Sequence, residues 1–487
     1  MDAELIEHYL HDRSRVGVPA GDTPRGRAGG AACGDLIEIG LRVSSGRLGD
    51  LVQCSSGCAA ARAAAAAVAE LADGATLREA ALLDADAVSA ELGGLGPLGL
   101  HAAELAAEAL HRALGVAVAT ADEPLVHPPD QGERLLVAMS GGVDSAVAAL
   151  LELRRCADVF ALTLELWSDP SADATASCCS AAAVRSARAL AHSLGIPHLT
   201  IDLRDRFRAG VIEPFLEGYA AGVTPNPCVR CNGAVRIEPM VEIAARLGAA
   251  ALATGHYARV LAEPEGPLLA AAADDAKDQT YMLAALPART LARMRFPLGG
   301  MLKGEVRGLA AEAGLAVADQ AESQDLCFLA GIGKAGFLAR HGGLGEREGE
   351  IVSSAGELLG THRGQHLFTV GQRRGIGVAS PEPLYVLATD AERNRVTVGP
   401  AAELEVEDVA IRDAVLHRPA RRVSSIRLRY RARPLRCRIE ESARERLRAG
   451  RHERLDVALG APARAGAPGQ TAVLLDGDLV IGHGTII

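Results

Sequence analysis

The sequence predicts an α/β protein with four parts: an N-terminal α+β domain, a parallel-sheet domain, a small central domain and a C-terminal β-barrel. Three observations predict this fold class. A chain of 487 residues exceeds the usual size of one domain, so it needs several hydrophobic cores. Apolar strands alternate with helices in the middle of the chain, whereas short strands and turns follow from about residue 348. Hydrophobic residues make up 49% and charged residues 23%, a composition that excludes disorder of the whole chain.

The N-terminal segment predicts one strand and two helices. Leu36–Val43 alternates apolar and polar residues as a strand does, and both Ala59–Ala72 and Leu100–Leu114 have the Ala, Leu and Glu content of helices. Three prolines among charged residues then mark a linker over residues 121–132. We therefore expect a first domain over residues 1–120.

The middle of the chain predicts a parallel sheet in a domain over residues 133–345. An apolar strand, Leu135–Met139, leads into a glycine-rich loop, and a helix follows over Val143–Leu153. Strands and helices then continue to alternate, which is typical of βαβ units. These later elements are predicted at Val159–Leu166, Ala181–Leu194, His198–Asp202 and Leu252–Thr254.

The C-terminal part predicts an all-β structure, divided into a central domain over residues 346–402 and a barrel over residues 403–487. Short apolar runs are separated by turn residues throughout, which is typical of small barrels. The predicted strands are Phe368–Val370, Leu384–Ala388, Arg395–Val398, Val406–Ile411, Ile426–Ala432, Ala472–Leu475 and Leu479–Ile481.

Charge is distributed unevenly along the chain. Residues 1–130 contain 19 acidic residues and 9 arginines, which accounts for the whole net charge of −10. Residues 421–454, here called the Arg-rich segment, contain 13 arginines and only four glutamates. Such a segment predicts contacts with a phosphate backbone. The alternative is a solvated strand face in a chain that prefers arginine, since there are only three lysines in all.

Three features predict a cytoplasmic protein. No apolar run of about 18 residues occurs, so no membrane span is expected. Met1–His11 carries acidic residues and no basic residue before an apolar core, so a signal peptide is not expected. We therefore expect the ten cysteines to lie in a reducing compartment, where reactive or metal-bound thiols are commoner than disulfides.

The glycine-rich loop Ser140–Ser145 points to nucleotide chemistry. Glycines between a strand and a helix let the backbone approach phosphates at the helix N-terminus. The loop lacks the Gly-Lys-Ser/Thr ending of a Walker loop, so transfer of a γ-phosphate is not expected. It resembles the pyrophosphate-binding loop of the ATP pyrophosphatase superfamily, whose members adenylate a carbonyl oxygen and in which the aspartate, here Asp144, helps to place Mg²⁺. A plain strand–helix turn is the alternative.

Two cysteine-containing segments indicate the acceptor chemistry. Cys228 and Cys231 form a C-x-x-C pair in a proline-rich loop, and Cys327 follows in the segment Glu322–Phe328. Thiolation needs one thiol that bears a persulfide and another that releases the sulfur as a disulfide forms. Two buried cysteines together with half of a zinc site are the alternative from spacing alone.

From about Glu133 onward, the chain resembles the tRNA-specific 2-thiouridylase family, which converts the wobble uridine of certain tRNAs to 2-thiouridine. The resemblance rests on seven motifs in one order: Ser140–Ser145, Thr224–Asn232, Ala253–Arg259, Lys277–Tyr281, Phe296–Gly299, Glu322–Phe328 and Phe368–Gly377.

The resemblance implies a role for each matched residue. Cys231 corresponds to the family's nucleophile and Cys327 to its persulfide-bearing cysteine. The implied contacts with ATP are Ala138, Met139, Ser140, Gly141, Gly142, Val143, Asp144, Ser145, Leu164 and Gly255. Those facing the target base or the tRNA are Asn226, Pro227, Cys228, His256, Lys277, Asp278, Gln279, Arg429, Tyr430 and Gln470. A structural role for His256 and a plain surface position for Lys277 stay open.

Cys228 departs from the family, many of whose members have an aspartate at this position. Three thiolates, from Cys228, Cys231 and Cys327, would suffice for a [4Fe–4S] cluster whose free iron binds sulfide. The persulfide route needs only Cys231 and Cys327, and it is the one we expect, with the cluster route left open. The adjacent Cys178 and Cys179 are interpreted as structural.

Residues 1 to about 118 resemble the U-type iron–sulfur cluster assembly scaffold. The resemblance rests on Ala32–Asp35, Gly46–Asp50, Gly57–Ala61 and Leu100–Ala106. It implies a site for zinc or a nascent iron–sulfur cluster, with the ligands Cys33, Asp35, Cys58 and His101.

The scaffold family's third cysteine is replaced by Ala102 in this chain. Two thiolates, one carboxylate and one imidazole still suffice for a tetrahedral metal site, and Cys54 is a substitute ligand. A degenerate module that only recruits a cysteine desulfurase is the alternative.

The sequence therefore predicts an ATP-dependent tRNA-uridine 2-sulfurtransferase that uses ATP, Mg²⁺, tRNA and sulfur from a cysteine desulfurase or other donor. The fused N-terminal domain would raise the local concentration of that donor. One rival is an iron–sulfur scaffold or carrier, against which the nucleotide loop argues. Another is an ATP pyrophosphatase that thiolates a different base or a small molecule. The Arg-rich segment and Lys277–Gln279 favour tRNA over this second rival.

Overall fold

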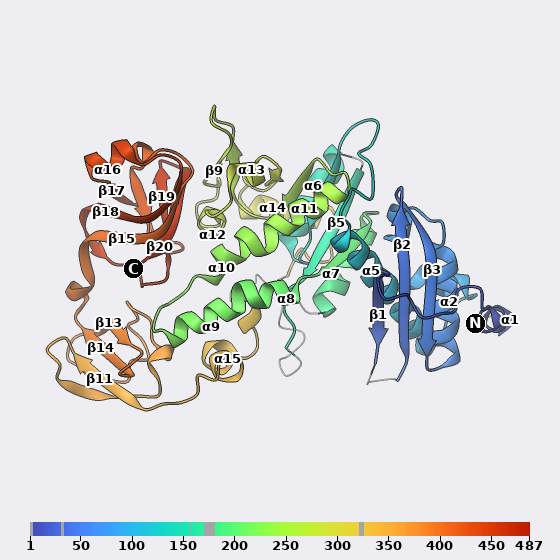
Figure 1. Cartoon of the computed structure of the whole chain (residues 1–487), viewed down its shortest axis with the longest axis horizontal. Helices are drawn as coiled ribbons and strands as arrows, with labels where there is room; N and C mark the ends of the chain where they lie inside the picture. The colour runs from blue at the N-terminus through green and yellow to red at the C-terminus, as the bar shows by residue number, and fades with distance from the viewer. Residues whose placement is uncertain (1–2, 31–33, 157, 170–180, 321–325) are drawn as a thin grey trace.

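The computed structural model describes residues 3–30, 34–156, 158–169, 181–320 and 326–487. Figure 1 shows the N-terminal part at one end of an elongated molecule, a parallel sheet in the middle and a closed barrel at the other end. A small four-stranded sheet lies beside the barrel. The predicted fold class, α/β with an N-terminal α+β domain and a C-terminal barrel, is confirmed.

The N-terminal module is a three-stranded antiparallel sheet covered by helices. Its central helix is α2, whose run of alanines is almost entirely buried, so that neighbouring elements approach closely. The strand predicted at Leu36–Val43 and the helix at Ala59–Ala72 are confirmed, and the helix predicted at Leu100–Leu114 is longer at both ends. The elements of the module are α1 (Ala3–His11), β1 (Arg25–Gly29), β2 (Leu36–Ser44), β3 (Arg47–Ser56), α2 (Ala59–Ala72), α3 (Leu77–Ala80), α4 (Ala85–Glu91) and α5 (Pro97–Thr120).

The middle of the molecule is a five-stranded parallel sheet, here called the central sheet, with the order β10-β7-β4-β5-β6. Its strands are β4 (Arg134–Ala138), β5 (Asp158–Glu165), β6 (His198–Asp202), β7 (Ala251–Thr254) and β10 (Met294–Arg295). Because all five strands are parallel, their carboxyl ends meet at one edge, where open α/β sheets bind ligands. The four predicted strands of this sheet and the helices α6 (Val143–Arg155) and α7 (Ala181–Ser193) are confirmed.

Several shorter elements surround the central sheet, and the thiol-bearing loop continues into one of them. They are α8 (Arg204–Phe207), η1 (Arg208–Ile212), α9 (Glu213–Ala220), α10 (Pro227–Arg230), η2 (Cys231–Ile237), α11 (Glu238–Arg246), β8 (Arg259–Leu261), β9 (Leu268–Ala270), α12 (Thr280–Leu283), α13 (Ala288–Leu291), α14 (Lys303–Glu312), η3 (Cys327–Leu329) and α15 (Gly333–Gly342).

The C-terminal part forms two separate sheets. A four-stranded sheet has the order β12-β11-β14-β13, and six strands close into a barrel because β15 pairs with both β18 and β20. The elements are β11 (Gly349–Ser353), β12 (Leu358–His362), η4 (Gln365–Leu367), β13 (Tyr385–Asp390), β14 (Arg395–Gly399), η5 (Ala401–Leu404), β15 (Glu405–Leu416), η6 (Ala420–Arg422), β16 (Ser425–Arg427), β17 (Leu435–Arg438), α16 (Glu441–Arg446), β18 (Gly450–Arg464), β19 (Thr471–Asp476) and β20 (Leu479–Ile486).

Two of the predicted strands in this part are wrong. Phe368–Val370 follows a short 3-10 turn and forms no strand, because Gln372 folds back and accepts a hydrogen bond from the Thr369 N–H at 3.1 Å. The strand predicted at Ile426–Ala432 ends at Arg427, and Arg431 further on has a φ of 60°, which an extended strand does not allow.

Helix α5 joins the N-terminal module to the central sheet. On one side Gly26 of β1 touches it, since a Cβ there would lie 2.1 Å from the Ala109 carbonyl oxygen. On the other side Gly115 of α5 lies against β6, and a Cβ on it would lie 1.9 Å from the Thr200 carbonyl oxygen. The same buried apolar cluster contains Leu114 of α5 and residues of β6. The module is therefore packed against the edge of the central sheet without a gap.

The barrel is joined to the middle of the molecule through backbone pairing. Strand β20 pairs with β9 in antiparallel fashion, with Leu479 opposite Ala270, so the barrel and the two short strands after β7 share one sheet. Among the described residues, no helix combines the length and apolarity that are needed to cross a bilayer.

Candidate functional site

A cavity of about 330 Å³, here called the central cavity, lies at the carboxyl ends of β4 and β5. It brings together residues from the glycine-rich loop, the thiol-bearing segments and the barrel, which are far apart in sequence. Eleven of the residues predicted for ATP, sulfur or tRNA line it: Ala138, Met139, Ser140, Leu164, Pro227, Cys228, Cys231, His256, Gln279, Cys327 and Tyr430.

The glycine-rich loop lies between β4 and α6 in a conformation that fits a phosphate. Gly141 has a φ of 77°, which favours glycine, and α6 begins after Gly142 with no side chain capping its first turn. The Ser145 hydroxyl accepts a hydrogen bond from the Ser140 N–H at 3.2 Å and donates to the Gly142 carbonyl at 2.9 Å. The hydrogen bonds of Ser145 thus fix the shape of the loop, and the N–H groups at the start of α6 remain available to an anion.

Gly255 brings a second strand end against this loop. It follows β7, and a Cβ on it would lie 2.8 Å from the Asp144 carbonyl carbon and from the Ser145 nitrogen. Only glycine therefore allows this close approach. Leu162 and Leu164 of β5 form an apolar wall of the same cavity, which suits the flat face of a purine base.

Asp144 takes part in a charged cluster at the start of α6. The Lys303 ammonium lies 2.6 Å from its Oδ1, and the Tyr257 hydroxyl donates to the same oxygen at 2.9 Å. The Lys303 Nζ also lies 5.8 Å from the centre of the Tyr257 ring. One carboxylate beside a phosphate-binding loop fits Mg²⁺, which commonly takes its other ligands from phosphate and water.

The thiol-bearing helix forms another wall of the central cavity. Asn226 caps it by accepting a hydrogen bond from the Val229 N–H at 3.3 Å. The chain then runs through α10, a π-helical turn that begins at Cys231, and α11. Cys228, Asn232 and Arg236 are four residues apart and all line the cavity, as one face of a helix does. A π-turn at this point is typical of functional sites.

The three predicted thiols border the same cavity but differ in their surroundings. Burial, and then the neighbouring Cys231, raises the pKa of the Cys228 thiol to about 12. Cys327 begins η3, and the next residue, Phe328, packs against Phe337 with ring centres 5.0 Å apart. Within the described ranges, which include all three thiols, no group of three or more His, Cys, Asp or Glu side chains could hold a metal ion.

The residues predicted to touch tRNA fall into two groups. Tyr430 and His256 line the cavity, and burial, followed by the charge of Arg236, lowers the pKa of His256 to about 3. Asp278 is buried instead and receives a hydrogen bond from Arg427 of the barrel at 2.8 Å. Gln470 donates from Nε2 to the Thr224 carbonyl at 3.0 Å. The last two side chains therefore join the barrel to the loops around the cavity.

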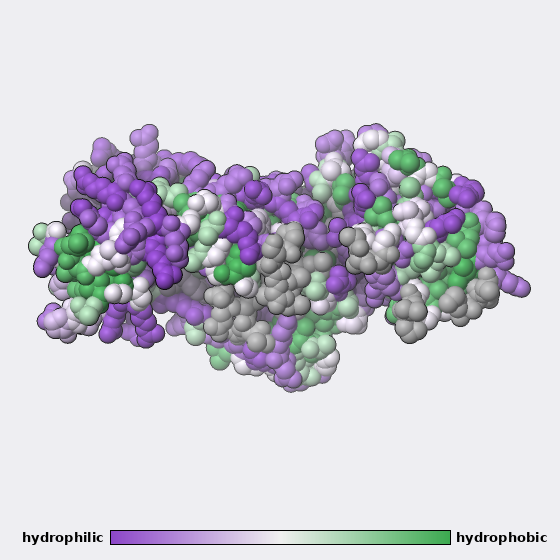
Figure 2. All heavy atoms as spheres, turned by 90° about the horizontal axis from the view of Figure 1, so that it is seen from below, coloured by the Kyte–Doolittle hydropathy of each residue, from purple (hydrophilic) through white to green (hydrophobic). Residues whose placement is uncertain are grey.

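The Arg-rich segment is largely solvent-exposed. All its arginines except Arg422 and Arg427 are exposed, and Arg429 is among the exposed ones. In Figure 2, which shows the molecule from below, the end that carries the four-stranded sheet and the barrel has many hydrophilic side chains beside a hydrophobic patch. This arrangement fits the predicted contact with a phosphate backbone.

The predicted metal site of the N-terminal module is only partly assembled from described residues. Cys58 donates to Asp35, with its backbone N–H 2.7 Å and its Sγ 3.3 Å from the two carboxylate oxygens. His101 is half exposed and pairs with Glu104 at 3.7 Å, and Ala102 is buried. Cys33, Cys178 and Cys179 lie outside the described residues. Asp35 and Cys58 are thus the two predicted ligands that the structure places in contact.

Two positively charged residues of the central cavity and its loop, Lys303 and Arg236, were missed from the sequence. Lys303 follows the motif Phe296–Gly299 closely and is one of only three lysines, a signal that could have identified it. Arg236 lies on the same helical face as Cys228. Its spacing from Cys228 would have indicated this if a helix had been predicted after the C-x-x-C pair.

Known protein families match most of the chain in four pieces. Residues 2–118 match the NifU-like N terminal domain, and residues 133–331 match the tRNA methyl transferase HUP domain. Residues 335–400 match the tRNA methyl transferase PRC-barrel domain, and residues 413–486 match the Aminomethyltransferase beta-barrel domain.

One curated relative matches nearly the whole chain, and others match about three quarters of it. The Bifunctional protein NifU/MnmA of Rubrobacter xylanophilus is 42% identical over 494 residues, which cover 99% of this chain and 97% of the relative. The tRNA-specific 2-thiouridylase MnmA of Geobacter metallireducens is 40% identical over 363 residues, which cover 73% of this chain and 96% of the relative. A second protein of that name, from Syntrophotalea carbinolica, is 41% identical over 361 residues, covering 73% of this chain and 99% of the relative.

The fold and the central cavity define a class of protein: a nucleotide-binding α/β enzyme of the HUP type, carrying thiols beside its phosphate loop and fused to a NifU-like module. The chain belongs to the bifunctional NifU/MnmA family.

Proposed function

We propose that this protein is an ATP-dependent tRNA 2-thiouridylase acting on the wobble uridine in the cytoplasm. The observation that carries the proposal is the central cavity, in which the phosphate loop, Cys231, Cys327 and Tyr430 of the barrel meet. A carrier of sulfur or clusters would need no nucleotide loop. Relatives named tRNA-specific 2-thiouridylase, which match about three quarters of the chain, support the same activity.

The first step is activation of the base. The uridine O2 attacks the α-phosphorus of ATP, an O–P bond forms, and pyrophosphate leaves. The N–H groups at the start of α6 and the Lys303 ammonium lie where they would stabilise the negative charge on the departing pyrophosphate. Asp144 is the residue that would hold Mg²⁺, and the ion would supply further charge neutralisation.

The second step is replacement of the activated oxygen by sulfur. The terminal sulfur of a persulfide on Cys327 attacks C2, and the C2–O bond breaks as AMP leaves with the oxygen. The Cys231 thiolate then attacks the Cys327 sulfur, which breaks the S–S bond and leaves the other sulfur on C2. A Cys231–Cys327 disulfide results, and an external dithiol reduces it before a cysteine desulfurase reloads Cys327.

Two observations support the persulfide route over a [4Fe–4S] cluster on Cys228, Cys231 and Cys327. A cluster needs all three as thiolates. Burial raises the pKa of the Cys228 thiol to about 12, so a cluster would have to offset the cost of ionising it, whereas the persulfide route leaves it as a thiol. Nor do the three thiols converge as a metal-binding group in the described ranges.

The test is nucleoside mass spectrometry of tRNA incubated anaerobically with the protein, ATP and a cysteine desulfurase system. We expect 2-thiouridine and an equal amount of pyrophosphate. Pyrophosphate without a thiolated nucleoside would point to another acceptor, and the absence of both products would overturn the proposal.

Replacing Lys303 with methionine is expected to weaken pyrophosphate formation about a hundredfold, because a buried charge that neutralises the leaving group is lost. The methionine keeps much of the side-chain volume over the Tyr257 ring. Steady-state assays of pyrophosphate release would measure kcat and KM for ATP. Lys277→Met, a change at a lysine on a different segment, is the matched control and should alter tRNA affinity more than the ATP parameters. Equal ATP parameters in K303M and the parent would contradict the role of Lys303.

The tRNA is expected to lie across the barrel and the mouth of the central cavity. Exposed Arg429 and the rest of the Arg-rich segment would contact phosphates, with Tyr430 near the target base. Asn226, Pro227 and Cys228 would face the base from the opposite wall. Asp278 and Gln470 would act indirectly, since both are bonded to other parts of the protein.

The N-terminal module is proposed to receive sulfur or a metal centre from a cysteine desulfurase system. The Asp35–Cys58 contact at the start of α2 supports a thiol site there, and zinc or iron–sulfur binding would need Cys33 or His101 in addition. Cys58→Ser is expected to slow thiolation driven by the desulfurase and to leave thiolation driven by sulfide unchanged. If Cys58→Ser and the parent thiolated tRNA at the same rate with the desulfurase, delivery through this site would be excluded.

A further inference from the structure

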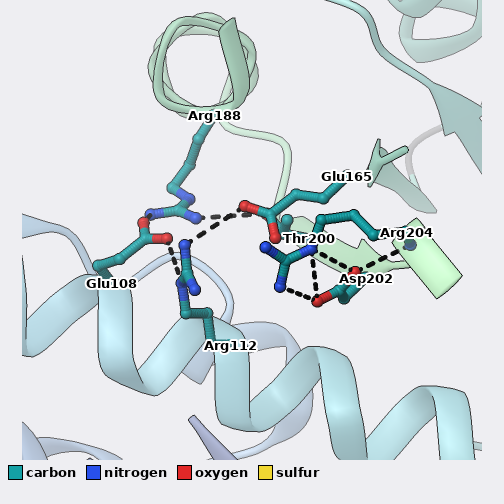
Figure 3. A network of polar contacts seen from close by, with 7 residues as sticks. All are labelled: Glu108, Arg112, Glu165, Arg188, Thr200, Asp202 and Arg204. Carbon is teal, nitrogen blue, oxygen red and sulfur yellow. Dashed lines mark hydrogen bonds and ion pairs between the residues drawn. The ribbon is translucent and has the colours of Figure 1, made fainter. Parts of the chain in front are cut away.

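The contacts between α5 and the central sheet include a buried ionic network, shown in Figure 3. Glu108 of α5 receives hydrogen bonds from Arg112 and from Arg188 of α7, each at 2.8 Å. Arg112 also reaches Glu165 at 3.4 Å, and Arg188 reaches the Thr200 hydroxyl at 3.3 Å. The network therefore links one helix of the N-terminal module to α7, β5 and β6.

The charges in this network are largely withdrawn from water. The side chains of Glu108, Glu165 and Arg188 are between 10% and 16% exposed. Burial raises the pKa of Glu108, but Arg188 and Arg112 outweigh it and bring that pKa down to about 2. Arg112 thus donates to both carboxylates, but Glu108 also has Arg188. Removing Arg112 would therefore chiefly leave Glu165, whose pKa is raised by burial, without its hydrogen bond.

Glu165 is placed next to the walls of the central cavity. It is the last residue of β5, and its neighbours on either side, Leu164 and Leu166, both line the cavity. Arg112 therefore holds the strand end from which these two leucines project. None of the described residues of the N-terminal module (3–30 and 34–120) lines the central cavity itself.

We propose that α5 is a positioning element of the central cavity, in which Arg112 and Glu108 fix the carboxyl end of β5 and so the apolar wall that receives the nucleotide. The inference rests on the proposed function only where enzyme activity is the quantity measured. In this assignment Arg112 is a positioning residue. The N-terminal module then supports the shape of the ATP site through its contacts with β5, in addition to any delivery of sulfur to the thiols.

The opposite end of β5 offers a matched control. Arg78 of the same module pairs with Asp158, the first residue of β5, at 2.9 Å. This ion pair crosses the same boundary between the module and the sheet, but it lies at the amino end of the strand, away from the cavity. Arg78→Ala therefore removes a contact of the same kind without touching the end that carries Leu164 and Leu166.

The experiment compares R112A, R112K, R78A and the parent full-length chain. ATP affinity is measured by calorimetry, and hydrogen exchange is followed at the backbone amides of residues 163–168. We expect R112A to weaken ATP binding about fivefold and to speed exchange at the end of β5, with R112K restoring part of both. R78A should leave both quantities unchanged. Glu165→Gln should add little in the R112A background, because the two residues share one interaction.

Two results would overturn the proposal: R112A and R78A changing ATP affinity equally, or neither of them changing it. The first result would mean that the contacts only hold the module in place. Since ATP affinity and hydrogen exchange require no thiolated product, they distinguish failure of this inference from failure of the proposed thiouridylase activity. For the active enzyme, R112A should raise KM for ATP and leave kcat nearly constant, whereas a general loss of folded protein would lower kcat alone.

Discussion

Replacing Cys231 or Cys327 with serine is expected to abolish the formation of 2-thiouridine, with a loss of at least about a thousandfold. A serine hydroxyl neither carries a persulfide sulfur nor resolves one, so no partial reaction through the same route remains. Both residues border the central cavity, and serine occupies less space than cysteine, so the fold should persist. Mass spectrometry of the tRNA nucleosides measures the effect.

Pyrophosphate release separates the two cysteine variants from a general loss of activity. Adenylation precedes sulfur transfer, so both variants should still consume ATP in the presence of tRNA. Cys437→Ser is the matched control, since Cys437 is a partly buried thiol of β17 that does not line the cavity. A Cys327→Ser variant that still forms 2-thiouridine would contradict the persulfide route. Loss of thiolation in Cys228→Ser together with bound iron in the parent protein would instead favour the cluster.

Replacing Gly115 with alanine is expected to destabilise the whole molecule by about 2–3 kcal/mol. The added Cβ would lie 1.9 Å from the Thr200 carbonyl oxygen, so α5 and β6 would have to move apart. Their separation would open the shared apolar cluster and weaken the ionic network between Arg112 and Glu165. Thermal unfolding followed by calorimetry measures the loss.

Gly308→Ala is the matched control for this prediction. Gly308 lies inside helix α14, and a Cβ there would meet no atom within 4 Å. Alanine is favoured over glycine in a helix interior by about 1 kcal/mol, so this variant should gain stability. The two substitutions are chemically identical and have opposite expected signs. A stabilised G115A variant would show that α5 does not lie against β6 as the structure places it.

Local sequence patterns predicted the elements that depend on few neighbours. The helix Ala59–Ala72 was placed at its observed bounds because its alanines favour a helix wherever they pack. The strand β18 was missed, although it is 15 residues long, because its charged residues give no clear alternation. Its extended form depends on pairing with β15, an interaction between segments distant in sequence.

The candidate site was predicted residue by residue, but its internal contacts were not. The pairing of Lys303 with Asp144 joins residues 159 positions apart, which no local pattern reports. Asp278 and Gln470 were expected to face tRNA, since a sequence does not show whether a polar side chain meets solvent or another part of the protein. The structure places both against their own chain, where they join the barrel to the cavity.

The hydrogen bond from Gln470 to Thr224 has a consequence for the order of events during synthesis. The ribosome makes the loop that leads to Cys231 long before Gln470, which lies 246 residues further along the chain. Until the barrel emerges and closes, this loop lacks the support of Gln470, and the Tyr281 hydroxyl lacks its acceptor, the Thr471 carbonyl, which lies 2.7 Å away in the finished structure. The N-terminal module, in contrast, is complete at the start. A nascent chain therefore completes its N-terminal module before the loop that leads to Cys231 has the support of the barrel.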